Sequence, residues 1–451
     1  MKSGLRWIGL AALAGCYRPA PQGGATCGTS RVCPDGLHCV GEPGTCESSE
    51  TDAAREIDAC PGATCVGSDL VGCDSTITCN LGCLTAPQAH CGQLVPSNGV
   101  TTALLAGATA DVNGATDWTF FTDNGEIRKG NVTLRPAGTG IVNGIGFTVV
   151  DTVGVFTAHS FTQNGGDIWS AAGTHPLTLF AATTIVVNGQ IEARGGQFSS
   201  AGAGGTGGNL STTTGMCHGR AGRLLSTNHG EGGGGGGGAQ IGGAGGASNG
   251  GASSGIGGMV CSSPSTIPLR GGWGGGAGGA SSNNPGGGGG GGISLVAMDS
   301  ITVAASAAVG TPGGGGISTL NGEGGGGGGG GGAVLLEAPM VTLHGALTAG
   351  GGGGAAPSDG DGNNGSLTTT GVAQAGVFTG PGGTVRGGTG GTNALPGAGQ
   401  NYTYDDGLGT VISRGGGGGG AAGRLEIKAR TMDVTPSIQS PTAAQSDAVI
   451  Q

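Results

Sequence analysis

Aromatic and charged residues are scarce in this chain, and long apolar runs are missing. Of its 451 residues, 3% are aromatic and 10% are charged, and the formal net charge is −10. The chain has only 17 Lys and Arg residues in no basic patch, whereas phosphate contacts need clustered cations, so we expect no nucleic-acid partner. No later run is long enough for a membrane-spanning helix. Catalytic signatures such as a P-loop or HExxH are also missing, which favours a protein that is not an enzyme.

Glycine dominates the composition instead. The chain has 113 Gly and 19 Pro residues, a share that is typical of low-complexity sequences. However, 35% of the residues are hydrophobic, and many of them are Val, Ile, Leu and Ala in short alternating runs that disordered chains do not carry. Alternation with period two predicts strands with one buried face. Because helical periodicity is almost absent, the sequence predicts an all-β protein.

The first 16 residues have the pattern of an export signal that ends in a cysteine. Lys2 and Arg6 supply positive charge, residues 7–14 are mostly apolar, and Gly15 precedes Cys16. This pattern resembles the lipobox of bacterial lipoproteins, which implies that residues 1–15 are removed and that Cys16 is acylated. The protein would then bind a membrane through Cys16, and loss of the two cations would change its net charge from −10 to −12. The alternative is an ordinary signal peptide with a cysteine near its cleavage site.

The remaining 12 cysteines fall into three groups of even size, which favours disulfide bonds. The groups are Cys27, Cys33, Cys39 and Cys46; Cys60, Cys65, Cys73, Cys79, Cys83 and Cys91; and Cys217 with Cys261. The connectivity inside the first two groups stays open. A zinc site built on Cys79, Cys83, His90 and Cys91 is the alternative, but zinc sites usually combine two tight ligand pairs.

Changes in composition divide the chain into segments. The two clusters of cysteines contain few apolar residues, so disulfides must stabilise them in place of a core. The expected segments are a signal peptide (1–15), a lipid-proximal linker (16–24), a module with four cysteines (25–47), an acidic linker (48–58), a module with six cysteines (59–92), the β-rich start of a solenoid (93–192), a glycine-rich repetitive solenoid with inserts (193–440) and a tail (441–451).

Four segments of the chain share one pattern of two alternating runs separated by a bend. They are 177–193, 293–309, 334–349 and 425–440. The first run ends in Ala181, Ala297, Ala338 or Ala429, and the second contains Ile185, Ile301, Val341 or Met432. Such a unit predicts one coil of a β-solenoid similar to a parallel β-helix, in which equivalent residues stack. The alternative is a β-sandwich of ordinary hairpins with flexible glycine loops.

Long glycine tracts occur at 232–238, 286–292, 324–332 and 415–420. Three of them end just before one of the repeated segments, which a random linker would not do. We predict that the tracts are ordered or semi-ordered and run side by side as extended three-fold helices, because a backbone without side chains packs very closely. The tracts resemble the polyglycine bundles of some antifreeze proteins and phage tail-tip adhesins. The alternative is that they are flexible linkers.

Four inserts at 209–230, 252–270, 355–380 and 392–413 separate the tracts and carry much of this region's polar chemistry. Cys217 lies in the first and Cys261 in the second, so a bond between them would bring these two inserts together. Loops on a rigid scaffold are common binding sites, so a surface glycan or a protein is the expected ligand.

One insert contains a candidate calcium site at Asp359, Asp361 and Asn363. Oxygen ligands at alternating positions resemble the start of a calcium-binding loop. The position of the final ligand holds Thr370, not Glu, and a polar glycine turn is the alternative. We expect no cofactor other than this Ca²⁺.

A carbohydrate-active enzyme is the alternative to a binding protein. Solenoid lyases and hydrolases of polysaccharides need an acidic cluster, often beside a cation. Asp405 and Asp406 with Arg386 or Arg414 form the best set that the sequence offers.

The order of lipobox, cysteine modules and glycine-rich repeats resembles that of the Cys-rich and Gly-rich surface lipoproteins of some Gram-negative bacteria. The resemblance implies a lipid-anchored envelope or surface protein with a structural or adhesive role. The residue after Cys16 is Tyr17 and not Asp, which by analogy with enterobacterial sorting favours the outer membrane, on its periplasmic or its cell-surface side.

Overall fold

The computed structural model describes two units of the chain, residues 1–59 and 60–451. The described residues are 25–26, 37–40, 45–48, 62–72, 75–79, 81–114, 117–208, 216–226, 228–248, 255–261, 265–280, 284–319, 324–435 and 437–451. All of the regular structure in these ranges consists of strands, apart from two short 3₁₀ helices, η1 (Thr102–Leu105) and η2 (Gly278–Ala280). The expectation of an all-β protein is therefore confirmed.

The first unit contains one antiparallel sheet with the strand order β1-β3-β2. Its strands are β1 (Ala25–Thr26), β2 (Leu37–Val40) and β3 (Thr45–Ser48). Cys16, Cys27 and Cys33 lie outside the described residues, and the side chains of Cys39 and Cys46 are not described.

The second unit begins with the module of six cysteines, which forms two small antiparallel sheets. The strands are β4 (Thr64–Val66), β5 (Asp69–Gly72), β6 (Ser75–Thr78), β7 (Cys83–Leu84) and β8 (His90–Cys91). Its core is small, with Leu70, Cys79 and Ala89 as the buried residues, so covalent links must supply much of its stability.

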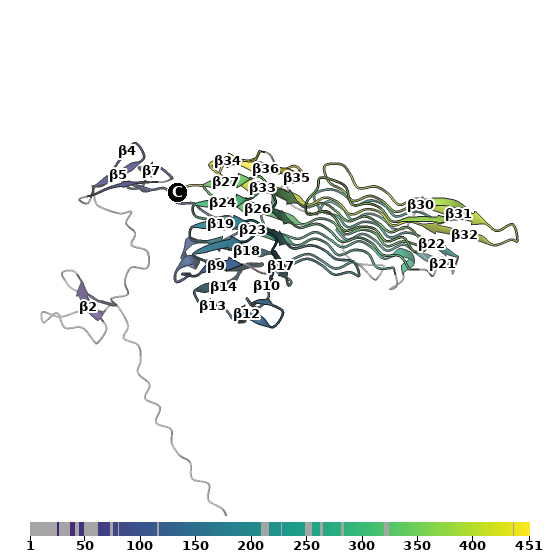
Figure 1. Ribbon diagram of the computed structural model, residues 1–451, viewed down its shortest axis with the longest axis horizontal. Helices are drawn as coiled ribbons and strands as arrows, with labels where there is room; N and C mark the ends of the chain where they lie inside the picture. The colour runs from purple at the N-terminus through teal and green to yellow at the C-terminus, as the bar shows by residue number, and fades with distance from the viewer. Residues whose placement is uncertain are drawn as a thin grey trace, which may run out of the picture. The chain divides into compact units, whose positions relative to one another are not determined.

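Three larger sheets, whose strands are mostly parallel, follow in the second unit, and Figure 1 shows their strands stacked in columns. Sheet 1 consists of β9 (Asp111–Gly114), β16 (Ser160–Gln163), β19 (Thr184–Val187), β24 (Ser300–Val303), β27 (Met340–Leu343) and β34 (Thr431–Asp433). Sheet 2 consists of β12 (Val132–Arg135), β11 (Ile127–Lys129), β10 (Trp118–Phe121), β17 (Ile168–Ala172), β20 (Gln190–Glu192), β25 (Ala308–Gly310), β28 (Ala346–Thr348) and β35 (Ile438–Ser440). Sheet 3 consists of β13 (Gly140–Val142), β14 (Ile145–Val150), β15 (Val153–Ala158), β18 (Leu177–Ala181), β23 (Gly292–Ala297), β26 (Ala333–Glu337), β33 (Arg424–Lys428) and β36 (Ala444–Ser446).

Each repeated segment adds one strand to each of the three sheets, in the order sheet 3, sheet 1, sheet 2. The four segments pair with one another in parallel and in register. Ile185 is opposite Ile301, Ile301 is opposite Val341, and Val341 is opposite Met432. Equivalent positions of the repeat therefore lie in columns that cross the strands.

The core lies between the three sheets. In sheet 1 the side chains alternate between buried and partly exposed, which places one face of each strand inward. Near the first strands the core is aromatic: Phe120 packs edge to face on Phe156, and Trp169 also contacts Phe120. Towards the later strands it is filled by aliphatic residues such as Leu295, Leu336 and Ile427. The period-two pattern of the sequence thus encodes one continuous apolar core.

Antiparallel hairpins begin sheets 2 and 3. The pairs β11–β12 and β13–β14 occupy the first edges of these sheets, before the parallel strands start. β11 and β14 pair in antiparallel fashion with β10 and β15, and so satisfy amides and carbonyls on the outer side of the first parallel strands. The last strands, β34, β35 and β36, lie at the opposite edges.

Candidate functional site: the glycine bundle and its loops

The glycine tracts form a hydrogen-bonded bundle together with the segments that lie beside them. In the tract 324–332 the amide donors turn in succession to three different neighbours. Gly325, Gly328 and Gly331 donate to Gly415, Gly418 and Ala421; Gly326, Gly329 and Gly332 donate to Ile317, Gly314 and Thr311; and Gly327 and Gly330 donate to Gly276 and Trp273. Partners that recur at every third residue are what a helix with three residues per turn produces.

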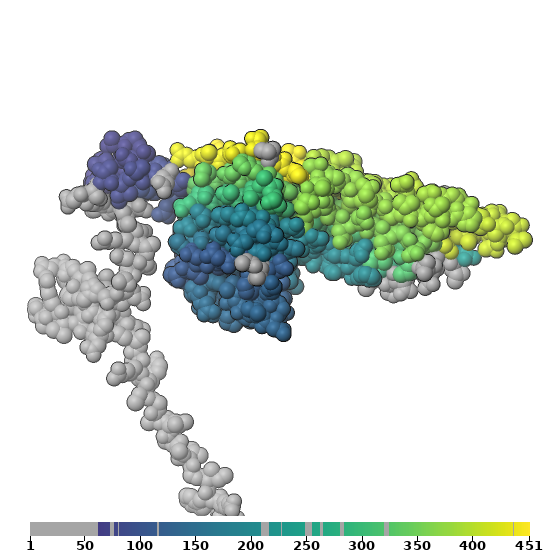
Figure 2. Space-filling view, in the orientation of Figure 1, coloured from purple at the N-terminus to yellow at the C-terminus, as the bar shows by residue number. Residues whose placement is uncertain are grey.

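The tract 232–238 has the same periodicity with other neighbours. Gly233 and Gly236 donate hydrogen bonds to Gly325 and Gly328, while Gly235 donates to Gly243. Rising numbers on both sides show that 232–238 and 324–332 run in the same direction. We call this set of tracts and their bonded neighbours the glycine bundle. Figure 1 shows its segments as long lines side by side, and Figure 2 shows the same segments as spheres.

Close packing explains why these positions are glycine. A Cβ atom added to Gly328 would collide with the carbonyl group of Gly352, and one added to Gly235 would collide with that of Gly419. The obstacle in both cases is backbone, which cannot rotate away as a side chain could. Every neighbour can therefore approach closely enough for lateral hydrogen bonds, at the entropic cost of ordering glycine.

The bundle joins sheet 3 directly. The tract 286–292 continues into β23, the tract 324–332 continues into β26, and residues 415–423 continue into β33. Paired strands in sheet 3 hold the tracts at one end. At the other end, Figure 1 places the strands of the inserts.

Two inserts that are distant in the sequence meet in one sheet at that end of the bundle. β21 (Leu224–Ser226) and β22 (His229–Gly230) belong to the insert 209–230, whereas β31 (Asn401–Asp405) and most of β32 (Val411–Gly415) belong to the insert 392–413. The strand order is β21-β22-β32-β31, and His229 is opposite Ser413. We call these four strands the tip sheet. The insert 355–380 contributes the first strand of another hairpin, β29 (Val377–Gly380), which pairs with β30 (Gly383–Arg386) just after the insert.

A disulfide bond joins Cys217 to Cys261, and so connects the first insert with the second. The amide of Met259 also donates a hydrogen bond to the carbonyl of Met216 at 2.7 Å. The two inserts are adjacent in space, although residues 44 apart in sequence form the bridge.

Aliphatic side chains on the tip sheet face solvent. Leu408, in the turn between β31 and β32, is 90% exposed, and Leu224 and Leu225 on β21 are 47% and 50% exposed. Val411 at the start of β32 is also exposed. Burial of such side chains against a partner would remove apolar area from water, which favours binding.

The two acidic residues of the tip sheet, Asp405 and Asp406, accept hydrogen bonds from the turn that follows them. Asp405 accepts a hydrogen bond from the amide of Gly407, and Asp406 accepts from the amides of Leu408 and Thr410. The amides of Leu408 and Thr410 hold the pKa of Asp406 below its usual value, so that carboxylate stays ionised. This arrangement stabilises the turn between β31 and β32.

The two arginines proposed to assist that pair have other contacts. The guanidinium of Arg414 donates to the hydroxyl of Ser358 at 2.6 Å, and the backbone amide of Arg386 donates to the side chain of Gln400. Burial lowers the pKa of Arg414. The structure therefore gives Arg414 a role in the attachment of the insert 355–380.

The three residues of the candidate calcium site are exposed, and each makes a hydrogen bond to another segment of the chain. Asp361 accepts a hydrogen bond from the amide of Ser318, the amide of Asp359 donates to the hydroxyl of Ser318, and the backbone carbonyl of Asn363 accepts from Gly353. Among the described residues no group of three or more His, Cys, Asp and Glu side chains is placed to hold a metal ion. The calcium site stays a prediction.

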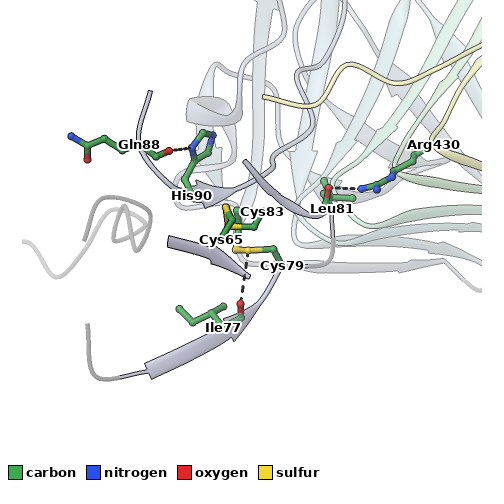
Figure 3. The surroundings of a disulfide bond; sticks show 9 residues. Cys65, Ile77, Cys79, Leu81, Cys83, Gln88, His90 and Arg430 are labelled. Carbon is green, nitrogen blue, oxygen red and sulfur yellow. Dashed lines mark hydrogen bonds between the residues drawn. A yellow bond between two sulfur atoms is a disulfide. The ribbon is translucent and has the colours of Figure 1, made fainter. Parts of the chain in front are cut away.

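The module 59–92 contains two disulfide bonds, Cys65–Cys83 and Cys79–Cys91, and Figure 3 shows the surroundings of the first. The three cysteines of the zinc alternative are all in these bonds, and the Nδ1 atom of His90 is 2.7 Å from the carbonyl oxygen of Gln88. Cys60 and Cys73 lie outside the described residues. The guanidinium of Arg430 donates to the carbonyl of Leu81, as Figure 3 shows, and connects this module with the turn before β34.

Two of the three buried charged residues in the described part of the chain, Arg135 and Glu337, have hydrogen bonds that no sequence pattern indicates. Arg135 is fully buried and donates to the carbonyls of four residues: Gly125, Pro136, Gly140 and Ile145. Glu337 is also fully buried and accepts two hydrogen bonds from Ser97, each of 2.8 Å. Nothing in the local sequence marks either residue, because their partners come from loops or from a segment 240 residues away.

Comparison with known proteins places this chain in no family: no family model, curated protein or solved structure matches it. In the described part of the chain, no helix is both long and apolar enough to span a bilayer. The class that the geometry defines is an all-β protein in which stacked, mostly parallel sheets carry a glycine bundle with a sheet of loops at its end.

Proposed function

We propose that this chain is a lipid-anchored protein of the bacterial cell envelope, with a structural or adhesive role and no catalytic activity. In this proposal the three stacked sheets form a β-solenoid, and the glycine bundle carries the tip sheet away from it. The lipid on Cys16 would hold the protein in the outer membrane, and the cysteine modules would separate the anchor from the solenoid.

The pairing of β22 with β32 carries this proposal. His229 and Ser413 are opposite each other, although one belongs to the first insert and the other to the last. A bundle whose amides are bonded to neighbours on three sides keeps these loops in one place. Preorganised loops lose little freedom when they bind, and this lowers the entropic cost of recognition.

The exposed aliphatic residues of the tip sheet are the proposed contact with a surface glycan or protein. Leu408 is 90% exposed and lies between β31 and β32. Leu225 is 50% exposed on the neighbouring insert. Leu225 lies on β21, and Leu408 lies in the turn that joins the paired strands β31 and β32, so a partner can bury both side chains against a formed sheet.

An adhesion experiment tests this role. Cells that carry the wild-type protein, the double variant Leu225→Asp/Leu408→Asp or the control Val132→Asp are allowed to bind glycan-coated and protein-coated surfaces. Val132 is 63% exposed on β12, in sheet 2, so its variant controls for an added surface charge. We expect the double variant to lose binding and the control to keep it. Equal binding by all three would contradict the adhesive role.

The anchor is tested separately with Cys16→Ala. We expect the wild-type protein to partition into the detergent phase with outer-membrane proteins, and the variant to leave that phase. Protease added to intact cells then reports which side of the membrane carries the protein. Equal partition of both proteins would exclude attachment through Cys16.

A further inference from the structure

The outer face of sheet 1 carries an ordered set of hydroxyl groups. On the four strands β16, β19, β24 and β27, the first and third residues point away from the core, as the alternating burial shows. We call these eight residues the hydroxyl face: Ser160, Thr162, Thr184, Val186, Ser300, Thr302, Met340 and Thr342. Six of the eight side chains carry a hydroxyl group.

Strand register places these residues in two straight columns. Thr162 is opposite Val186, Val186 is opposite Thr302, and Thr302 is opposite Thr342. The other column runs through Thr184, Ser300 and Met340 in the same way. No register shift interrupts these pairings, and Figure 1 shows β9, β19, β24, β27 and β34 stacked above one another.

The hydroxyl face stays partly exposed, whereas the outer face of sheet 3 is covered. Leu94, Val100 and Leu269 pack against outward-facing side chains of sheet 3 such as Phe180 and Val296. On sheet 1, the outward residues of β16, β19 and β24 are all partly exposed, and Met340 on β27 is 48% exposed.

Most of these hydroxyl groups have no partner inside the protein. Ser160 donates to Asp111 at 2.6 Å. Within the described residues, the other five hydroxyls of the face make no side-chain hydrogen bond. Elsewhere the chain uses its hydroxyls internally: Thr319 bonds to Asn284, and Thr442 bonds to Asn393. The hydroxyl face thus presents donors and acceptors to solvent in a fixed arrangement.

The spacing of this arrangement follows from β geometry. Neighbouring strands are about 4.8 Å apart, and residues two apart on one strand are separated by about 6.6 Å. Threonine is β-branched and stiff at χ1, so the hydroxyls of the four threonines are restricted in position. Each hydroxyl can donate one hydrogen bond and accept two, so it can bond in either sense to the water molecules of a lattice. The result is a rectangular mesh whose two repeats approximate those of oxygen atoms on a prism face of hexagonal ice.

The composition of the face argues against other ligands. None of the eight residues is charged, so an ionic polymer gains no ion pair there, and none is aromatic, so a sugar ring finds no stacking platform. Asp111 and Asp433 lie on the outermost strands, outside the central mesh. We propose that the hydroxyl face binds ice, with its threonine and serine hydroxyls completing the hydrogen-bond lattice of the crystal surface.

Ice affinity tests this proposal with purified full-length protein that carries Cys16→Ala to remove the lipid. Fluorescently labelled protein is exposed to a slowly growing ice hemisphere, and the fraction taken into the ice is measured against the liquid. Thr302→Lys and, independently, Thr342→Lys place a long charged side chain on the mesh. Thr133→Lys is the matched control, since Thr133 is exposed on β12 outside sheet 1.

We expect wild type and Thr133→Lys to enter the ice, and both mesh variants to enter it at least about tenfold less, the change that 1.4 kcal/mol of binding gives. Thermal unfolding tests whether each variant is folded. If one of the two mesh variants is not folded, the other is used for the comparison with wild type. Exclusion of the wild type from ice, or equal uptake of all folded variants, would overturn the proposal. So would binding to microcrystalline cellulose or chitin that only the mesh variants lose, because the face would then recognise a polysaccharide. None of these results depends on the lipid anchor or on Leu408.

Discussion

The amide of Gly328 donates a hydrogen bond of 2.9 Å to the carbonyl of Gly418, and a Cβ on Gly328 would collide with the carbonyl of Gly352. Gly328 therefore contacts two neighbouring segments of the protein through its backbone alone. The same relationship recurs along the bundle, which makes the absence of side chains a packing requirement.

Gly328→Ala is expected to destabilise the protein, because the added methyl group must displace a neighbouring backbone. Overpacking of this kind typically costs about 1–3 kcal/mol. Gly350→Ala is the matched control: its Cβ would meet only the carbonyl of Gly391 at 3.6 Å and the side chain of Thr392 at 3.7 Å. Urea unfolding measures both. A midpoint for Gly328→Ala as high as that of Gly350→Ala would mean that the tracts are loosely packed.

Removal of the bond between Cys217 and Cys261 is expected to loosen the two inserts that it joins. The double variant Cys217→Ser/Cys261→Ser should lose about 2–4 kcal/mol, since the bridge closes a long loop. Hydrogen exchange should become faster around Met216 and Met259 and stay unchanged in sheet 1, which serves as the internal reference. Unchanged exchange around the inserts would show that backbone hydrogen bonds alone hold them.

Arg135→Met is expected to be strongly destabilising. It removes a donor from the carbonyls of Gly125 and Ile145, whose hydrogen bonds are buried, and from those of Pro136 and Gly140, whose hydrogen bonds are partly buried. A buried carbonyl that is left unsatisfied costs about 1–3 kcal/mol. Arg128→Met on the adjacent strand is the control, because the side chain of Arg128 is 46% exposed; it should cost less than about 1 kcal/mol. Thermal unfolding of both variants compares them, and similar losses would refute a special role for Arg135.

Glu337 is expected to give the protein an unusual pH dependence. Burial raises the pKa of Glu337 above its usual value, even though hydrogen bonds from Ser97 and the charge of Lys428 oppose the shift. The folded state then binds the proton more tightly than the unfolded state. Glu337 therefore costs stability at neutral pH, and this cost disappears as the pH falls through its raised folded pKa towards the ordinary pKa of a glutamate.

Glu337→Gln should remove this dependence. The melting temperatures of wild type and variant, measured from pH 7 down to about pH 4, should differ by an amount that favours the wild type more at the acidic end. A difference that stays constant over this range would show that Glu337 keeps an ordinary pKa.

Several features of the fold could be predicted from the sequence. The alternation around Ile185, Ile301 and Val341 predicts strands with one buried face, and the recurrence of the pattern predicts that these residues share a column. The structure pairs them in register. Even cysteine groups predict disulfide modules, and the four cysteines that the structure describes in the module 59–92 form two bridges. Local periodicity suffices here because each strand carries its own pattern of burial.

The candidate site could be predicted only in part. The polar composition of the inserts marks their positions, but no complementary pattern predicts the pairing of His229 with Ser413. Composition suggests that Asp405 and Asp406 group with Arg386 and Arg414, whereas in the structure the two carboxylates accept hydrogen bonds from their own turn. Whether a side chain faces a neighbour or its own backbone depends on the loop conformation, which short polar sequences do not specify.

The sequence by itself determined the strands, their inward faces and the need for glycine in the tracts. Only the tertiary structure decided which neighbouring segment each glycine contacts. A run of identical glycines can slide by one three-residue turn without changing its contacts, so its own sequence cannot set its register. That register is set by the strands that follow: Ile293 pairs with Val334 and Val334 with Leu425, and their apolar side chains tolerate no slip.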